Sequence, residues 1–191
     1  MKIMTLAMTY LRERQTAPIR YLHITIIILV LSQIVVSNFM DFNDAGEIST
    51  DGIEFYATWL HIITGLFIIP LGLFLTGAVL IQHGFSNFFP YLGGDLSQVK
   101  ADIAQLMKRE LPEALPNGLA AVVQGLGLAA LLLVLSSGLI WFLSWNAHLP
   151  WADAIKEVHE FSTGFLLAYI VGHGAMGALH IFLLSRSHSD R

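Results

Sequence analysis

The chain has 191 residues, of which 55% are hydrophobic and 13% are charged, and its formal net charge is −4. The apolar residues come in long blocks, which indicates an integral membrane protein. The absence of cysteine excludes disulfides, cysteine-ligated iron–sulfur clusters and covalently attached c-type haem, so any cofactor must be held non-covalently by other side chains.

Four apolar blocks are each long enough to cross a bilayer as a helix. A lead-in over residues 1–19 precedes them, and it lacks the apolar core of a cleavable signal peptide. The predicted spans cover residues 21–40, 53–81, 119–145 and 151–184. We therefore predict an all-α fold, an integral membrane four-helix bundle that forms a single domain over residues 1–191.

The connections between the spans differ in length and charge. The first, residues 42–52, is acidic and contains no Lys or Arg. The longest, residues 82–117, contains a segment from about residue 98 to 110 whose apolar side chains fall on one helical face. Such a pattern predicts a helix that lies in the plane of the membrane surface.

The basic residues predict the orientation of the chain. Nine of the ten Lys and Arg residues lie in the N-terminal segment, the second connection and the C-terminal tail, and only Lys156 lies on the other side. By the positive-inside rule, both termini are expected to be cytoplasmic. Four tryptophans then fall near the outer boundary, as in an aromatic belt: Trp59, Trp141, Trp145 and Trp151.

Four histidines lie within the predicted spans. His159 and His173, in the fourth span, are roughly 21 Å apart along a helix but only about 40° apart around it. Depth pairs His61 with His159 near the outer side. It pairs His23 with His173 further in. Two pairs of imidazoles, each from two different helices, are the ligands that two six-coordinate haems need.

Other interpretations of these histidines are open at this stage. Intramembrane histidines also form hydrogen bonds between helices or relay protons, so a haem-free transporter or structural membrane protein is a competing class. Copper or zinc would favour a compact cluster over two separated levels. His180 lies seven residues after His173 on nearly the same face and is an alternative inner ligand, although depth favours His173.

Small and basic residues near the histidines are candidates for contact with a cofactor. Gly65 and Gly177 each follow a histidine by four residues, where a flat macrocycle would press on the backbone, but close helix packing explains them equally well. Arg20 and Lys156 each precede a histidine by three residues and are candidates to neutralise haem propionates. Membrane anchoring explains Arg20 just as well.

Several motifs resemble one known family. They are RYLH in the first span, WLHIITG in the second, SSG near the outer end of the third, and VHEFSTGFLLAYIVGHGAMGALH in the fourth. Over residues 20–184 the chain resembles the four-helix di-haem cytochrome b superfamily. This group includes bacterial cytochrome b561, the b-type cytochrome subunit of Ni/Fe hydrogenases and the gamma subunit of formate dehydrogenases.

The resemblance implies two b haems, bis-histidine ligated, in a multi-pass protein of the bacterial cytoplasmic (inner) membrane. The ligands carried over by position are His23, His61, His159 and His173. The implied function is that of a cytochrome b subunit of a respiratory dehydrogenase or hydrogenase, which exchanges electrons with ubiquinone or menaquinone. A stand-alone quinone oxidoreductase of the cytochrome b561 type, such as a superoxide oxidase, is the alternative.

The branch of this superfamily is left open by two features. Hydrogenase-type subunits usually have a further helix, and Gln124 stands in the third span where some stand-alone members carry a histidine. The expected partners are membrane lipid, a quinone and a redox protein subunit. Homo-oligomerisation is left open, and nucleic acid is not expected.

Overall fold

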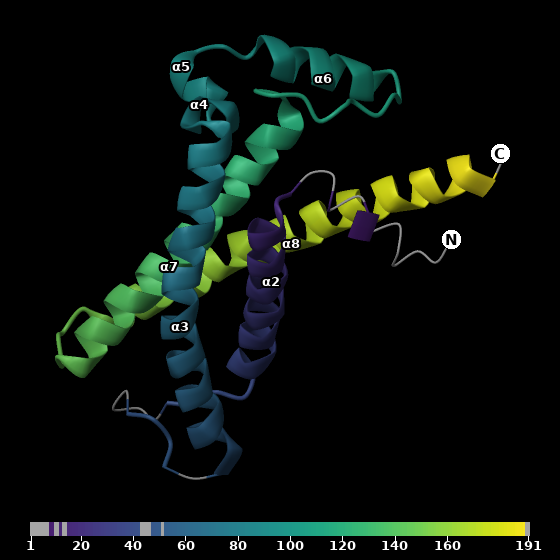
Figure 1. Ribbon diagram of the computed structural model, residues 1–191. Helices are drawn as coiled ribbons and strands as arrows, with labels where there is room; N and C mark the ends of the chain where they lie inside the picture. The colour runs from purple at the N-terminus through teal and green to yellow at the C-terminus, as the bar shows by residue number, and fades with distance from the viewer. Residues whose placement is uncertain (1–7, 10–11, 13–14, 43–46, 51, 190–191) are drawn as a thin grey trace.

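The computed structural model describes residues 8–9, 12, 15–42, 47–50 and 52–189, with backbone alone at 180, 183–184 and 186–189 (Figure 1). The chain folds into helices joined by short connections. They are α2 (Ala17–Ser37), α3 (Gly52–His83), α4 (Phe85–Phe88), α5 (Pro90–Gly93), α6 (Ser97–Met107), α7 (Leu119–Asn146) and α8 (Ala152–Ser189). No named strand occurs in the described part of the chain.

Four of these helices are long and apolar enough to cross a membrane, which confirms the predicted all-α, four-helix membrane fold. The candidate spans are Ala17–Ser37, Gly52–His83, Leu119–Asn146 and Ala152–Leu179. Many large apolar side chains of these helices point outward, including Ile28, Phe67 and Phe74. A helix that is apolar on all sides is suited to contact with lipid.

The first span begins and ends earlier than the sequence pattern predicts. Pro18, which falls within the predicted lead-in over residues 1–19, lies in the first turn of α2, because its fixed φ suits a helix start and its missing N–H is not needed there. At the other end, the Asn38 side chain donates to the carbonyl of Ile34 at 2.7 Å and helps to terminate α2 at Ser37.

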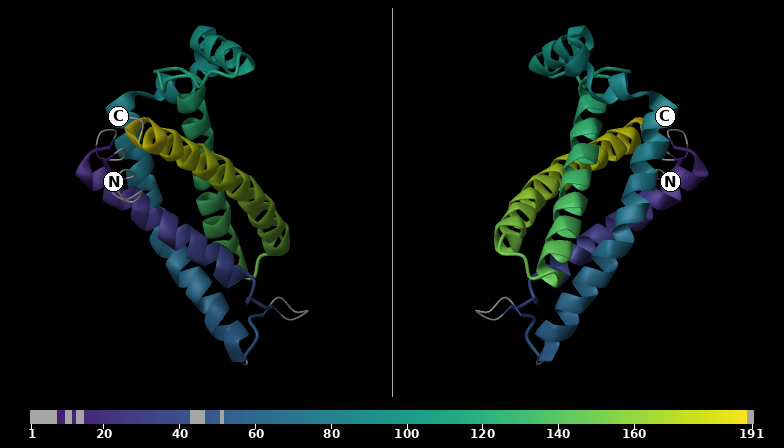
Figure 2. Two further views of the ribbon diagram at one scale, coloured as in Figure 1. Left: turned by 90° about the vertical axis from the view of Figure 1, so that its right-hand side faces the viewer. Right: turned by 90° about the vertical axis from the view of Figure 1, so that its left-hand side faces the viewer.

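The four long helices form two pairs. α2 packs along α3, α7 packs along α8, and α3 joins the pairs by packing on α7. In the described chain, α8 makes no comparable backbone contact with α2 or α3. Figure 2 shows both termini on the same side as the α4–α6 connection, with the other two connections at the opposite end.

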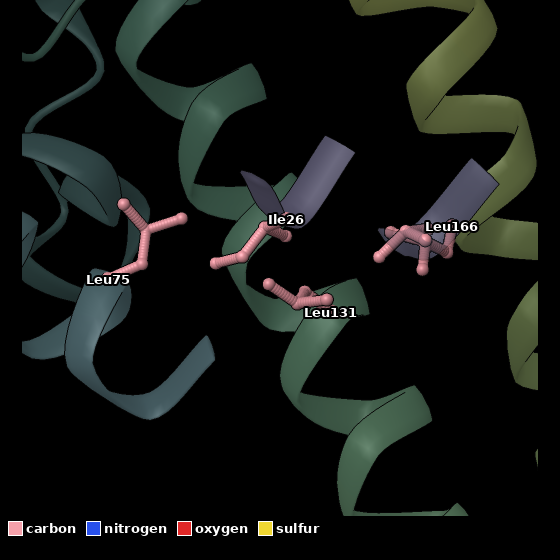
Figure 3. Close-up of a cluster of buried hydrophobic side chains, with 5 residues drawn as sticks. Ile26, Leu75, Leu131 and Leu166 are labelled. Atoms are coloured by element: carbon pink, nitrogen blue, oxygen red, sulfur yellow. The ribbon is translucent and has the colours of Figure 1, made fainter. Parts of the chain in front are cut away.

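A small apolar core holds the pairs together where the four helices meet. Figure 3 shows Ile26 of α2, Leu75 of α3, Leu131 of α7 and Leu166 of α8 in this cluster, which also includes Val30. Leu166 lies seven residues from His159 and seven from His173. The core therefore separates the two histidine levels.

The helix expected at the membrane surface is present as α6, which ends at Met107 instead of near residue 110. Arg109 adopts a left-handed backbone conformation with φ of 61°, which stops the helix. At its start, the hydroxyl and then the backbone N–H of Ser97 donate to Asp95, which holds the pKa of that carboxyl below its usual value. Its position in the membrane plane stays a prediction.

Asp102 joins α6 to α7. Its side chain is 1% exposed, and Oδ2 accepts a hydrogen bond of 2.7 Å from the backbone N–H of Leu119 in the first turn of α7. Oδ1 accepts a second bond of 2.7 Å from Gln98. A Cβ on Gly118 would lie 2.5 Å from Oδ2, so a glycine is required for this carboxylate to reach the helix end.

Candidate functional site

The outer pair of histidines comes from α3 and α8. The ring centres of His61 and His159 are 6.4 Å apart, and the ring planes are 85° apart. Both side chains line a cavity of about 390 Å³ whose walls are provided by all four long helices. Most of the lining is aliphatic or aromatic, as expected for the binding site of a large planar cofactor.

The inner pair comes from α2 and α8. The ring centres of His23 and His173 are also 6.4 Å apart, with the planes 61° apart. The two pairs are those that depth along the spans predicts. Each pair combines α8 with a helix against which the backbone of α8 does not pack closely.

This spacing fits two imidazoles on opposite sides of one metal ion. A ligating imidazole nitrogen lies about 2.0 Å from its metal and roughly 1.1 Å from its own ring centre, so trans ligands have ring centres about 6 Å apart. No group of three or more His, Cys, Asp or Glu side chains suited to a metal ion occurs among the described residues. The donor set therefore fits bis-histidine haem better than a compact copper or zinc site.

The orientation of His159 is set by α7. Its Nδ1 lies 3.1 Å from the backbone carbonyl of Val134 and 3.2 Å from the hydroxyl of Ser137. The Ser137 hydroxyl donates to the same carbonyl at 3.0 Å. A carbonyl can only accept, so Nδ1 carries the proton and Nε2 is left with the free lone pair of a metal ligand.

On the side of the outer cavity formed by α2 and α3, two buried polar atoms have no hydrogen-bond partner among the described residues. They are the Nδ1 of His61 and the Oε1 of Gln33. The Gln33 amide nitrogen donates to the Thr64 hydroxyl on the neighbouring helix. Unpartnered buried polar atoms are rare in native proteins, so this side of the cavity has capacity to bind a polar group.

The inner histidines have different neighbours. The ring of His173 is stacked on Tyr169, with ring centres 5.1 Å and planes 17° apart. Tyr169 in turn lies against Gly127 of α7, where a Cβ would be only 2.1 Å from the tyrosine ring. The Nδ1 of His23 lies 3.4 Å from the side-chain amide of Gln15.

The two predicted basic residues lie in different surroundings. Arg20 is 7% exposed, its Nη1 donates to the carbonyl of Gln15 at 3.4 Å, and its Nε is buried without a partner in the described structure. Lys156 lines the outer cavity, 3.8 Å from a carboxylate oxygen of Glu160 and 4.8 Å from the centre of the Phe42 ring.

The two predicted glycines also differ. Gly65 lines the outer cavity, and a Cβ there would lie 3.8 Å from Gln33 Oε1. Gly177 has no atom within 4 Å of the position that a Cβ would take, so it is not needed for packing within the described chain. The contact of either glycine with a cofactor stays a prediction.

Of the remaining histidines, the two with described side chains lie away from both pairs. His83 is exposed at the end of α3, beside the ring of Phe88, and His148 is exposed in the turn before α8. The side chain of His180, the alternative inner ligand, lies outside the described residues.

Comparison with known proteins identifies the family. A model of the family described as prokaryotic cytochrome b561 matches residues 14–188, which is most of the chain. The search of curated proteins and the search of solved structures each gave no match. Members of this family transfer electrons through b-type haem within membranes. The chain therefore belongs to the prokaryotic cytochrome b561 family and is a multi-pass membrane protein.

Proposed function

We propose that the chain binds two b haems at two depths and passes electrons from one to the other across the membrane. His61 and His159 are the proposed axial ligands of the outer haem. His23 and His173 are those of the inner haem. The observation that carries the proposal is that both pairs have the same ring-centre separation of 6.4 Å, with one member of each pair on α8.

Bound haem would supply one-electron chemistry at its iron, and the protein residues would bind it, orient it and exclude water. α8 contributes one histidine at each level and is the wall shared by both sites. The apolar lining of the outer cavity keeps its interior at low dielectric, which is one of the ways in which a protein tunes the potential of a haem.

Arg20 and Lys156 are the proposed partners of the haem propionates. A buried guanidinium with no carboxylate partner among the described residues is costly, and an anion close to Arg20 would offset that cost. Lys156 lies on the wall of the outer cavity and can exchange its long contact with Glu160 for a propionate. The Nδ1 of His61 can donate a further hydrogen bond at this level, and the Oε1 of Gln33 can accept one from a group that carries a proton.

The specific role that we propose is that of a cytochrome b subunit of a respiratory dehydrogenase or hydrogenase in the bacterial inner membrane. It would exchange electrons with ubiquinone or menaquinone. The connection from α4 to α7 carries three exposed bases, Lys100, Lys108 and Arg109, and is the proposed docking surface for a redox partner.

A stand-alone quinone oxidoreductase that oxidises superoxide is the second candidate. It needs a cation at the outer face to attract the anionic substrate. The one base on the predicted outer side, Lys156, is already the proposed partner of a propionate, and the acidic first connection, residues 42–52, would repel an anion, which favours the subunit role.

The haem proposal is tested by pyridine haemochrome analysis and reduced-minus-oxidised spectra of the purified protein. We expect two haems per chain. His61→Ala and His159→Ala should lose the same haem, His23→Ala and His173→Ala should lose the other, and His148→Ala should keep both. Loss of different haems from two members of one pair would contradict the ligand assignment, and absence of a Soret band would reject the function.

The subunit role is tested by purification from native membranes in a mild detergent. We expect a dehydrogenase or hydrogenase subunit to co-purify and quinol to reduce the haems of the complex. Isolation of the chain alone, with superoxide-dependent quinone reduction, would instead establish the second candidate.

A further inference from the structure

We infer that α7, which contributes no histidine to either pair, positions the outer ligand His159 and tunes the outer haem alone. Three groups act on His159: the carbonyl of Val134, the hydroxyl of Ser137 and the bare backbone of Gly138. The inference rests on the proposed function, because it takes His159 as a haem ligand.

The polar groups form a closed set of hydrogen bonds. Ser137 donates its proton to the carbonyl of Val134, so its oxygen is left to accept, and it shares the single Nδ1 proton of His159 with that carbonyl. Ser137 is 4% exposed, and water does not compete for this bond. A hydrogen bond from the outer nitrogen of a ligating imidazole fixes its tautomer and raises the basicity of the ligating nitrogen. A more basic ligand favours ferric iron and lowers the potential of a haem.

Gly138 fixes the position of the ring. A Cβ at this residue would lie 2.9 Å from Cε1 of His159, which is closer than real Cβ atoms approach, and 3.1 Å from Nδ1, which is tighter than most real contacts. Residues three and four apart share a helix face, so Ser137 and Gly138 both lie beside Val134 against the same imidazole. A side chain at Gly138 therefore requires the His159 ring or α7 to shift.

We expect the hydrogen bonds and the steric contact of α7 to affect the outer haem only. The contacts of α7 with the inner pair pass through Tyr169, which stacks on His173 and lies against Gly127. No hydrogen bond from α7 to His173 is present in the described structure. Variants of the outer contact should therefore leave the inner haem as an internal reference in the same molecule.

Ser137→Ala tests the hydrogen bond, and Ser136→Ala is its matched control. Both serines donate to the carbonyl three residues earlier, but Ser136 is exposed and its Oγ bonds to Leu133 at 3.1 Å, away from His159. Each variant is purified with its haems, and both haems are titrated potentiometrically. His61→Ala identifies the outer haem. We expect Ser137→Ala to keep two haems and raise only the outer midpoint potential, and Ser136→Ala to match the parent.

Gly138→Ala tests the steric contact, with Gly164→Ala as the control. Gly164 is also helical, but no atom lies within 4 Å of the Cβ that alanine would add. We expect Gly138→Ala to lose the outer haem or change its low-spin electron paramagnetic resonance signal, and Gly164→Ala to keep both signals of the parent.

The proposed function and the positioning role of α7 are contradicted by different results. If the parent protein lacks two haems, the proposed function fails. If the parent holds two haems and Ser137→Ala leaves both potentials unchanged, or moves both equally, the positioning role is overturned and the proposed function stands. The positioning role is also overturned if Ser136→Ala shifts the midpoint potential of the outer haem as much as Ser137→Ala does.

Discussion

The two paired histidines of α8, His159 and His173, have neighbours of different kinds. His159 has a hydrogen bond to a backbone carbonyl, whereas His173 has the flat face of Tyr169. A hydrogen bond polarises a ligand, and a stacked ring mainly restricts its rotation. In the proposed haem arrangement, the two levels would therefore have histidine ligands with different electronic properties.

Replacement of Tyr169 separates stacking from hydrogen bonding at the inner level. Tyr169→Phe keeps the ring and should leave the inner haem signal unchanged, whereas Tyr169→Leu removes it. An aromatic pair contributes about 1 kcal/mol beyond its area, so we expect Tyr169→Leu to weaken retention of the inner haem by roughly fivefold. Haem loss during titration with a haem-binding acceptor protein measures it. Equal loss from Tyr169→Phe would assign the effect to the hydroxyl group.

Sequence reasoning identified the paired histidines but not the residues that orient them. Fourteen-residue spacing on one helix is visible in the sequence because a helix has a fixed pitch. The contacts of Ser137 and Gly138 with His159 depend on how α7 rotates against α8, which no local pattern encodes. The SSG motif, residues 136–138, contains both residues, but the sequence alone does not predict a function for it.

At the scale of elements, the apolar blocks predicted the number and approximate bounds of the spans, because each must cover the same hydrocarbon thickness. The ends were harder to predict. Pro18 lies in the first turn of α2 instead of preceding the helix. Arg109 ends α6 through a left-handed backbone conformation, which an arginine in the sequence does not predict. The role of Asp102 was also invisible, since its partner lies 17 residues away.

Asp102→Ala should loosen the junction between α6 and α7. Loss of a helix cap costs about 1 kcal/mol, and burial of the unpaired N–H of Leu119 brings the expected loss to roughly 2 kcal/mol. Thermal unfolding in detergent, followed by circular dichroism, measures it. Asp95→Ala is the contrast, because Asp95 is exposed and its described hydrogen bonds come from Ser97, a near neighbour in the chain. A larger loss from Asp95→Ala would contradict the capping role.

At the scale of the whole molecule, the helix pairs place the ends and the connections of the chain on two opposite sides. The termini and the α4–α6 connection lie at one end, and the two shorter connections lie at the other (Figure 2). The distribution of basic residues predicts that the first of these ends is cytoplasmic.

Single cysteines test this orientation without background, because the chain has none of its own. Ala147 and Lys108 are exposed at opposite ends. In intact cells, a membrane-impermeant maleimide should label Ala147→Cys, and it should label Lys108→Cys only after the membrane is opened. The reverse pattern would invert the topology and exchange the outer and inner levels.

The apolar core between the histidine levels has a consequence for energy conversion. Leu166, Leu131 and Ile26 fill the centre of the bundle with side chains that carry neither protons nor ions (Figure 3). In the proposed arrangement, an electron that moves between the haems is not accompanied by a compensating charge through this region. Each turnover would then be electrogenic, working with or against the membrane voltage at about 2.3 kcal/mol per charge for 100 mV across the full membrane.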